Sequence, residues 1–158
     1  MVQLITPLQR AYLAGFLDGD GSIYVQAKPN NSYKYGFQVA PYIVLFQSQK
    51  DRENFAKVCD LINLGYLRSR KDGILEYIIG KKDNMEKFIS LVEPYVLMKK
   101  EQIILLKKIL ALKEKVETKK DFCALVKLID TFRELNYSKK SKCVLFGIQN
   151  RKNGLYQL

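Results

Sequence analysis

Hydrophobic and polar residues alternate along two stretches in the first third of the chain, and a period of two predicts β-strands. In residues 22–28, apolar side chains fall on one face and polar side chains on the other. The alternation resumes over residues 33–46, after a turn predicted at residues 29–32. Pro41 lies inside the second strand and has no backbone N–H, so we expect a bulge or a sheet edge there.

The later part of the chain switches between helical and strand-like patterns. Residues 65–70 and 74–79 predict a hairpin, because the Asp-Gly pair between them is a strong turn signal. Apolar residues at helical spacing predict helices over 51–63, from Asp83 to the residue before Pro94, over 99–117 and over 121–135. With a first helix before them, these elements give the order αββαββα and two additional C-terminal helices. That order predicts an α+β fold with antiparallel strands.

The first predicted helix covers residues 7–20 and ends in an acidic turn. Thr6 and Gln9 have the spacing of a capping box at its start. Asp18 and Asp20 lie at its C-terminal end, where the helix dipole disfavours negative charge. We interpret Asp18 as a turn residue that bonds nearby backbone. A second acid two residues later points to a cation at Asp20, and a hard divalent ion with oxygen ligands is the natural candidate.

The charge balance predicts a polyanionic partner. The 158 residues include 27 Lys and Arg but only 16 Asp and Glu, which gives a net charge of +11. Nucleic acid or an anionic membrane surface matches that charge, and no apolar run approaches the ~20 residues of a membrane-spanning helix. The chain has no His, which excludes Ser-His-Asp and Cys-His chemistry and most zinc catalysis. We interpret Cys59, Cys123 and Cys143 as reduced, buried hydrophobic residues.

Residues 13–21 resemble the motif of the LAGLIDADG homing endonucleases. The matching positions are Leu13, Ala14, Gly15, Asp18, Asp20 and Gly21. The motif occurs once, as in the homodimeric branch of that family. Similarity continues through Lys28-Pro29-Asn30, Gln38, Gln47 and Gly65-Tyr66, and on to Pro94. The resemblance implies the family's fold, in which antiparallel sheets form a DNA-binding saddle.

The resemblance also implies that motif helices from two subunits pack side by side. A glycine inside a helix costs ~1 kcal/mol relative to alanine, and close approach of another backbone would explain it. Each subunit would place one Asp20 near the two-fold axis, and a two-fold protein reads a pseudo-palindromic site. The residues expected at the dimer interface are Ala11, Tyr12, Ala14 and Gly15.

The polar faces of the predicted strands suit base recognition in double-stranded DNA. Gln and Asn can pair with adenine, and Arg with guanine, in the major groove. An ordinary solvated face is the alternative, and the motif makes base recognition the better interpretation. The expected DNA-binding residues are Tyr24, Gln26, Lys28, Asn30, Ser32, Tyr33, Gln38, Ala40, Tyr42, Val44, Tyr66, Arg68, Arg70 and Glu76, together with Lys139, Lys140 and Lys142 near the C-terminus.

Phosphodiester hydrolysis needs a water nucleophile and neutralisation of charge on the phosphate, and divalent metals supply both. By resemblance, Asp20 is the direct metal ligand, the Gly19 carbonyl is a second ligand, and Mg²⁺ is the ion. Mn²⁺ is expected to substitute for Mg²⁺, and Ca²⁺ to support binding without cleavage.

The resemblance adds an amide and basic residues around the attacking water. Gln47 matches the amide, and Lys99 matches one basic position, with a phosphate clamp as its alternative role. The basic residue that follows Gln47 is either Lys50 or Arg52, and Lys50 is preferred. Each could instead be an exposed residue at the start of the next helix.

We therefore expect a site-specific endonuclease that makes a metal-dependent double-strand break and promotes intron mobility. The alternative is an RNA-binding intron maturase on the same scaffold that does not cleave. A DNA-binding regulator is disfavoured, since the chain has no helix-turn-helix or zinc signature. No membrane partner and no small-molecule substrate are expected.

The length is typical of one domain, which we assign to residues 1–136. Residues 137–158 form a basic tail that belongs to the same domain or extends it toward DNA. The N-terminus has no pattern of a secretory signal or a transit peptide, so we expect translation where the protein acts. The resemblance implies an organelle that encodes and translates the protein, a chloroplast in preference to a mitochondrion.

Overall fold

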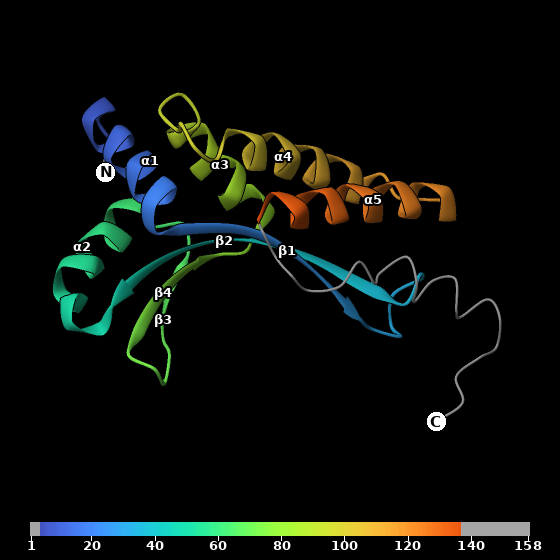
Figure 1. Cartoon of the computed structure of the whole chain (residues 1–158), viewed down its shortest axis with the longest axis horizontal. Coiled ribbons are helices and arrows are strands. Elements are labelled where there is room, and N and C mark those ends of the chain that lie inside the picture. Colours follow the sequence, from blue (N-terminus) through green and yellow to red (C-terminus); the bar gives the residue numbers. More distant parts are fainter. Residues whose placement is uncertain (1–3, 137–158) are drawn as a thin grey trace.

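The two predicted hairpins join into one antiparallel sheet in the computed structural model, which describes residues 4–136 (Figure 1). The order β1-β2-β4-β3 arises because β2 pairs with β4. The sheet is arched, and its concave face is turned away from the helices (Figure 1). Its strands are β1 (Gly21–Pro29), β2 (Phe37–Ser48), β3 (Tyr66–Ser69) and β4 (Ile74–Ile79).

The predicted helices are all present among the described residues. The capping box at the first helix is confirmed, since the Thr6 N–H donates to the Gln9 side chain at 2.9 Å and the Gln9 N–H donates to the Thr6 hydroxyl at 3.3 Å. A short 3₁₀ turn, Gln49–Asp51, leads into the second helix. The helices are α1 (Pro7–Asp20), α2 (Arg52–Ile62), α3 (Lys82–Val92), α4 (Lys100–Glu114) and α5 (Lys119–Leu135).

The hydrophobic core lies between the sheet and the helices above it (Figure 1). The strand faces are as predicted: Ile23 and Val25 of β1 and Ile43 of β2 are buried in this core. Leu13 and Leu17 of α1 belong to the same cluster. The alternate positions of the strands, which carry most of the polar side chains, therefore point to the concave face.

β2 begins later than the sequence predicted, at Phe37 instead of residue 33. The intervening residues form a turn, in which the Asn30 N–H donates to the Gly36 carbonyl and the Gly36 N–H donates to the Tyr33 carbonyl, both at 2.8 Å. Gly36 has a φ of 75°, which glycine adopts without a Cβ clash. The alternation of residue types continues through the turn, so it concealed the turn in the sequence.

Pro41 lies in a regular stretch of β2. β1 and β2 keep one register along all 9 residues of β1, with Pro41 opposite Val25, so the bulge that we considered is absent from this ladder. β4 pairs with β2 only from Ile43 onward, which leaves Pro41 without a described strand on its other side. The expected local edge is therefore present, and it accommodates a residue without an N–H.

The last two helices differ from their predicted bounds because a cap separates them. α4 ends at Glu114 instead of residue 117, and the Thr118 hydroxyl accepts from the Asp121 N–H at 3.2 Å to begin α5. No helix in residues 4–136 is both long and apolar enough to cross a membrane. Cys59 is buried as expected, whereas Cys123 is only partly buried. The predictions for the tail, including Lys139, Lys140, Lys142 and Cys143, lie outside the described residues.

Candidate active site and nucleic-acid interface

The C-terminal end of α1 presents oxygen atoms where the chain enters β1, toward the end of the arch that lies beside α2 (Figure 1). Asp20 is the last residue of α1, and both Asp20 and Gly19 are exposed. The Gly21 N–H donates to the Leu17 carbonyl, whereas a helix end leaves its final carbonyls without intrahelical partners. A Cβ placed on Gly19 would meet no atom within 4 Å, so the space beside it is open.

These atoms fit a hard divalent cation that keeps part of its water shell. Within residues 4–136, no group of three or more Asp, Glu, His or Cys side chains could hold a metal. Asp20 and the Gly19 carbonyl are the kind of ligands that Mg²⁺ prefers, and Mg²⁺ commonly binds one or two carboxylates with water and phosphate oxygens. The donor set therefore suits an ion that also contacts a phosphate.

Asp18 connects the end of α1 to the start of α4. Its carboxylate accepts hydrogen bonds from the backbone N–H groups of Leu97, Met98 and Lys99, at 2.8, 3.1 and 3.1 Å. The Lys99 ammonium donates to the Asp18 carbonyl oxygen at 2.7 Å. The interpretation of Asp18 as a turn residue is therefore wrong, because it lies inside α1 and its partners are 79 to 81 residues away. No local sequence pattern signals this tertiary contact.

Gln47 lies at the end of β2, beside the end of α1. Leu45 pairs with Gly21, the first residue after α1, and Gln47 follows two residues later on β2, where it pairs with Leu75 of β4. Its side-chain carbonyl accepts from the Ser48 N–H at 2.8 Å. The Gln47 NH₂ group has no partner among the described residues and is left to bind water or phosphate.

The two alternatives for the basic residue after Gln47 have different surroundings. The Arg52 guanidinium donates to the Ser69 hydroxyl at 2.8 Å and is therefore held against β3. Lys50 is exposed in the 3₁₀ turn, and its ammonium makes no hydrogen bond or ion pair with the part of the chain that the structure describes. This difference favours Lys50 as the available cation near Gln47.

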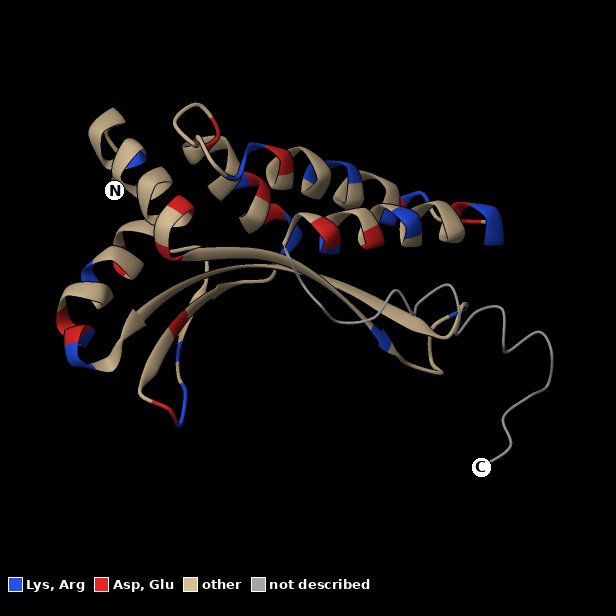
Figure 2. Cartoon of the chain, viewed as in Figure 1, with Lys and Arg blue, Asp and Glu red and all other residues tan. Residues whose placement is uncertain are grey.

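The concave face gathers most of the predicted DNA-binding side chains in adjacent rows. Asn30, Ser32 and Tyr33 follow β1 in the turn, and Tyr66 and Arg68 come from β3. Lys28 shares the alternate positions of β1 with Tyr24 and Gln26, and Figure 2 shows basic residues near the far end of β1 and at the β3–β4 turn. Across the β1–β2 ladder, the pairs are Tyr24 with Tyr42, Gln26 with Ala40 and Lys28 with Gln38.

Glu76 lies among these rows but is only 7% exposed. One carboxylate oxygen accepts from Arg68, whose Nε is 2.8 Å away, and the other oxygen lies 3.5 Å from Nη1 of Arg70. The hydrogen bond to Glu76 and its charge raise the pKa of Arg68, and burial followed by the charge of Glu76 raises the pKa of Tyr24. The geometry indicates that Glu76 positions two arginines, which corrects the expectation that it contacts DNA itself.

Val44 also departs from the prediction. It lies on the concave face, opposite Ser22 of β1 and Ile78 of β4, but its side chain is 1% exposed. It therefore lies beneath the surface of that face and offers almost no area to DNA. The alternation of residue types placed Val44 on the correct face of the sheet, but it could not show that the side chain is buried there.

One face of α1 remains open. Leu8 and Tyr12 are 84% and 54% exposed, and a Cβ on Gly15 would meet no atom within 4 Å. Nothing in the described chain therefore requires a glycine at this position. Ala11 is partly buried, and Ala14 is fully buried in the chain's own core, which corrects the expectation that its side chain lines a dimer interface.

The loop before α4 extends this open surface. Leu97 and Met98 are each 77% exposed, and Asp18 holds their backbone against the last turns of α1. Neither residue was singled out in the sequence, although the spacing of Leu8 and Tyr12 on one helical face was a signal for an apolar stripe. We call Leu8, Tyr12, Gly15, Leu97 and Met98 the α1 surface.

Comparison with known proteins agrees with this geometry. Residues 13–110 match the LAGLIDADG endonuclease family. DNA endonuclease I-CreI from Chlamydomonas reinhardtii is 35% identical over 132 residues, which are 83% of this chain and 80% of that protein. DNA endonuclease I-CvuI from Chlorella vulgaris is 28% identical over 95 residues, 60% of this chain and 59% of that protein.

Solved structures show the same fold. The crystal structure of homing endonuclease I-CvuI with its target in the presence of Ca has a TM-score of 0.84 at 24% identity, and the match covers 94% of this chain and 96% of that chain. The archaeal homing endonuclease I-Vdi141I complexed with DNA has a TM-score of 0.78 at 20% identity, over 93% of this chain and 96% of that chain. From its motif, its fold and these relatives, this chain belongs to the LAGLIDADG endonuclease family.

Proposed function

We propose that the chain is a site-specific homing endonuclease that hydrolyses phosphodiester bonds in both strands of a long pseudo-palindromic DNA site. The observation that carries the proposal is the place of Asp20, at the end of α1 where the polar concave face begins. The names of the relatives support it, because both I-CreI and I-CvuI are DNA endonucleases. A maturase without cleavage is not favoured, since it needs no metal-binding carboxylate at the negative end of a helix dipole.

Asp20 and the Gly19 carbonyl hold Mg²⁺, which Mn²⁺ replaces, whereas Ca²⁺ supports binding without cleavage. When bound, the divalent ion neutralises charge on the phosphate and lowers the pKa of the attacking water. The free NH₂ group of Gln47 orients that water by a hydrogen bond. Lys50 and Lys99 stabilise the negative charge that builds on the phosphate oxygens.

Base recognition comes from the concave face. Arg68 and Arg70, held by Glu76, suit bidentate contacts to guanine, and Gln26 and Gln38 suit adenine. Asn30, Ser32 and Tyr33 extend beyond the end of β1 and reach the outermost base pairs of each half-site. The remaining DNA-contacting residues are Tyr24, Lys28, Ala40, Tyr42 and Tyr66, with Lys139, Lys140 and Lys142 in the tail.

The active form is a homodimer. One chain contributes a single Asp20, so cleavage of two strands needs the Asp20 of a second chain near the two-fold axis. The α1 surface supports this arrangement, because it exposes apolar side chains around a glycine that leaves room for another backbone. The relatives come from two algae. We place this protein likewise in an organelle, a chloroplast in preference to a mitochondrion, where it promotes the mobility of the intron that encodes it.

The test compares cleavage with binding for the wild type and Asp20→Asn. A target is first selected from a randomised DNA library by binding in Ca²⁺, and plasmids that carry it are then incubated with Mg²⁺. We expect linear product from the wild type only, with a Kd within about threefold for both proteins. Binding without cleavage by the wild type in Mg²⁺ or Mn²⁺ would refute the endonuclease. Cleavage by Asp20→Asn would refute the role of the carboxylate.

A further inference from the structure

Two side chains fasten the β1–β2 turn to the loop between α4 and α5. The Tyr35 hydroxyl donates to the Glu117 carbonyl oxygen at 2.8 Å, and the Lys34 ammonium donates to the same oxygen at 2.9 Å. The Tyr35 ring stacks on Phe122 of α5, with centroids 5.0 Å apart and planes inclined by 19°. These contacts join segments 82 and 83 residues apart. We call the contacts at Glu117 and Phe122 the turn latch.

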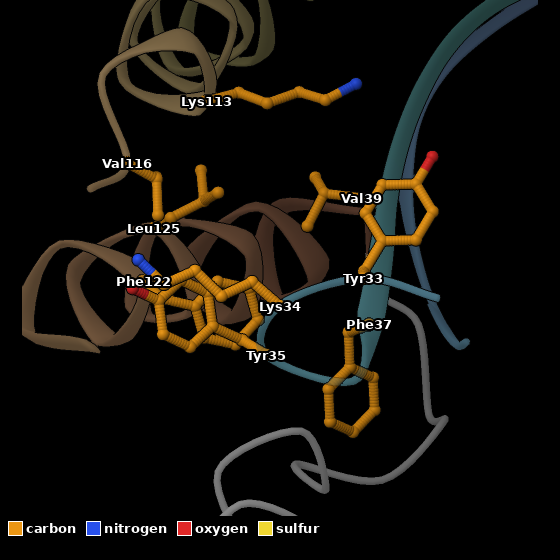
Figure 3. Close-up of a pocket in the computed structure, with 9 residues that line it drawn as sticks. All are labelled: Tyr33, Lys34, Tyr35, Phe37, Val39, Lys113, Val116, Phe122 and Leu125. Atoms are coloured by element: carbon orange, nitrogen blue, oxygen red, sulfur yellow. The ribbon is translucent and has the colours of Figure 1, made fainter. Parts of the chain in front are cut away.

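A cavity of about 210 Å³ lies behind the turn latch (Figure 3). Figure 3 shows the rings of Tyr35 and Phe122 on one side of it and Val39 of β2 on the other. Val116 and Leu125 form the apolar wall on the helix side. The open space means that fewer side-chain atoms pack against this part of the turn. The hydrogen bonds at Glu117 and the stack of Tyr35 on Phe122 are therefore the contacts that fix its position.

The turn is closed by hydrogen bonds between its own residues. The Ser32 N–H donates to the Asn30 side chain at 3.0 Å, and the Tyr33 N–H donates to the Asn30 carbonyl at 3.2 Å. The Gly36 N–H closes the turn on the Tyr33 carbonyl at 2.8 Å. The position of Tyr35 thus sets the positions of the three side chains assigned above to the outermost base pairs.

We propose that the turn latch determines sequence specificity at the outermost base pairs of each half-site. Tyr35 touches no base, and it acts as a positioning residue for Asn30, Ser32 and Tyr33. The inference rests on the proposed DNA-binding function, which it deepens. A neutral hydrogen bond changes an equilibrium by a factor of roughly 2 to 10. A polar side chain that is displaced from its base would reduce the preference for that base by a comparable factor.

Tyr35→Phe is the sharpest variant, because it removes one oxygen atom and keeps the ring stacked on Phe122. Tyr95→Phe is the matched control, since the Tyr95 hydroxyl makes no hydrogen bond with the described residues. Each protein selects from a DNA library randomised at every position, and base preference is then measured position by position. We expect Tyr35→Phe to lose roughly 2- to 10-fold preference at the outermost positions, with inner positions and cleavage of the best site within twofold of the wild type. An even loss across the site, or no loss, would overturn the proposal.

A second measurement tests the latch without DNA. Amide hydrogen exchange of a peptide that covers residues 30–36 reports how firmly the turn is held. We expect exchange in this peptide to be roughly 2- to 10-fold faster in Tyr35→Phe, with no change in Tyr95→Phe or in peptides from β4. Unchanged exchange would overturn the latch whatever the library shows. Failure of the wild type to select any sequence would instead refute the proposed function, so the two failures are distinguishable.

Discussion

The charged groups of Asp18 and Lys99 do not pair with each other, although the two residues are joined by two hydrogen bonds. The Lys99 ammonium donates to the backbone carbonyl of Asp18, and the Asp18 carboxylate accepts from the backbone N–H of Lys99. The carboxylate therefore serves the N-terminal end of α4, where the helix dipole favours a negative charge. Lys99 keeps its own charge, with two further N–H donors, beside the end of α1 that carries Asp20.

Asp18→Asn should weaken both the stability and the activity of the protein. The amide keeps one oxygen acceptor but loses the charge that holds three N–H groups. We expect the free energy of unfolding to fall by about 1 kcal/mol in urea titrations and cleavage in Mg²⁺ to fall at least tenfold. Asp60→Asn is the control, because Asp60 is exposed on α2 and makes no hydrogen bond with the described residues. Equal effects of both substitutions would contradict the special role of Asp18.

Glu76→Gln should trade specificity for general affinity. The substitution keeps the size of the side chain and removes the negative charge that restrains Arg68 and Arg70 on the concave face. We expect tighter binding to scrambled DNA and a smaller ratio of target to scrambled affinity, because phosphate attraction rises while the arginines lose their fixed direction. Binding curves at several salt concentrations measure both. Glu53→Gln, on the exposed side of α2, removes the same charge as a control and should leave the ratio nearly unchanged, because Glu53 makes no hydrogen bond or ion pair with the described residues.

Gly15 offers a way to separate folding from assembly. Gly15→Ala adds a Cβ where the chain itself has open space, so the single subunit should gain ~0.5–1 kcal/mol from higher helix propensity. Gly15→Leu should prevent close approach of two α1 helices and yield monomers in sedimentation velocity experiments. Lys57→Leu, on the exposed side of α2, controls for the added apolar surface. A stable dimer of Gly15→Leu would place the interface elsewhere.

Cys59 predicts a loss of stability in alkali. Burial raises the pKa of its thiol from 9.0 to about 11, so the folded protein keeps its proton to higher pH than the unfolded chain does. This contribution is complete below pH 9 and is lost as the pH rises toward 11. The free energy of unfolding should fall with rising pH less steeply in Cys59→Ala than in the wild type, by up to ~1.4 kcal/mol per pH unit. Urea titrations between pH 8 and pH 11 measure the slope, and an identical slope in the wild type and Cys59→Ala would contradict the effect of burial on this thiol.

Local sequence patterns predicted most of the fold, because strand faces and helix caps depend on residues that are close together in the sequence. Alternation placed Ile23, Val25 and Ile43 toward the core, and Thr6 with Gln9 marked the start of α1. The pattern failed where backbone conformation decided the outcome, as in the turn that delays β2 until Phe37.

The candidate site was harder to predict, because its details depend on contacts across the chain. Resemblance to a family named Asp20, Gln47 and Lys99. It could not reveal that Asp18 supports Lys99, nor that Glu76 is enclosed by two arginines. The contacts of Asp18 and Glu76 depend on how deeply a side chain is buried and on partners about 80 residues away or on another strand. Residue spacing in the sequence does not show either property.

α4 joins two places that do different work. Asp18 holds the start of this 15-residue helix beside Asp20, and the turn latch fastens the loop just past its end. At 1.5 Å per residue, the helix is about 22 Å long. The length of α4 therefore sets the distance between the phosphate that is cut and the outermost base pair that is read. One added residue would lengthen α4 by about 1.5 Å and rotate its two ends by about 100° relative to each other. An insertion or deletion in α4 would therefore separate base recognition from cleavage, even if the two sites each stayed intact.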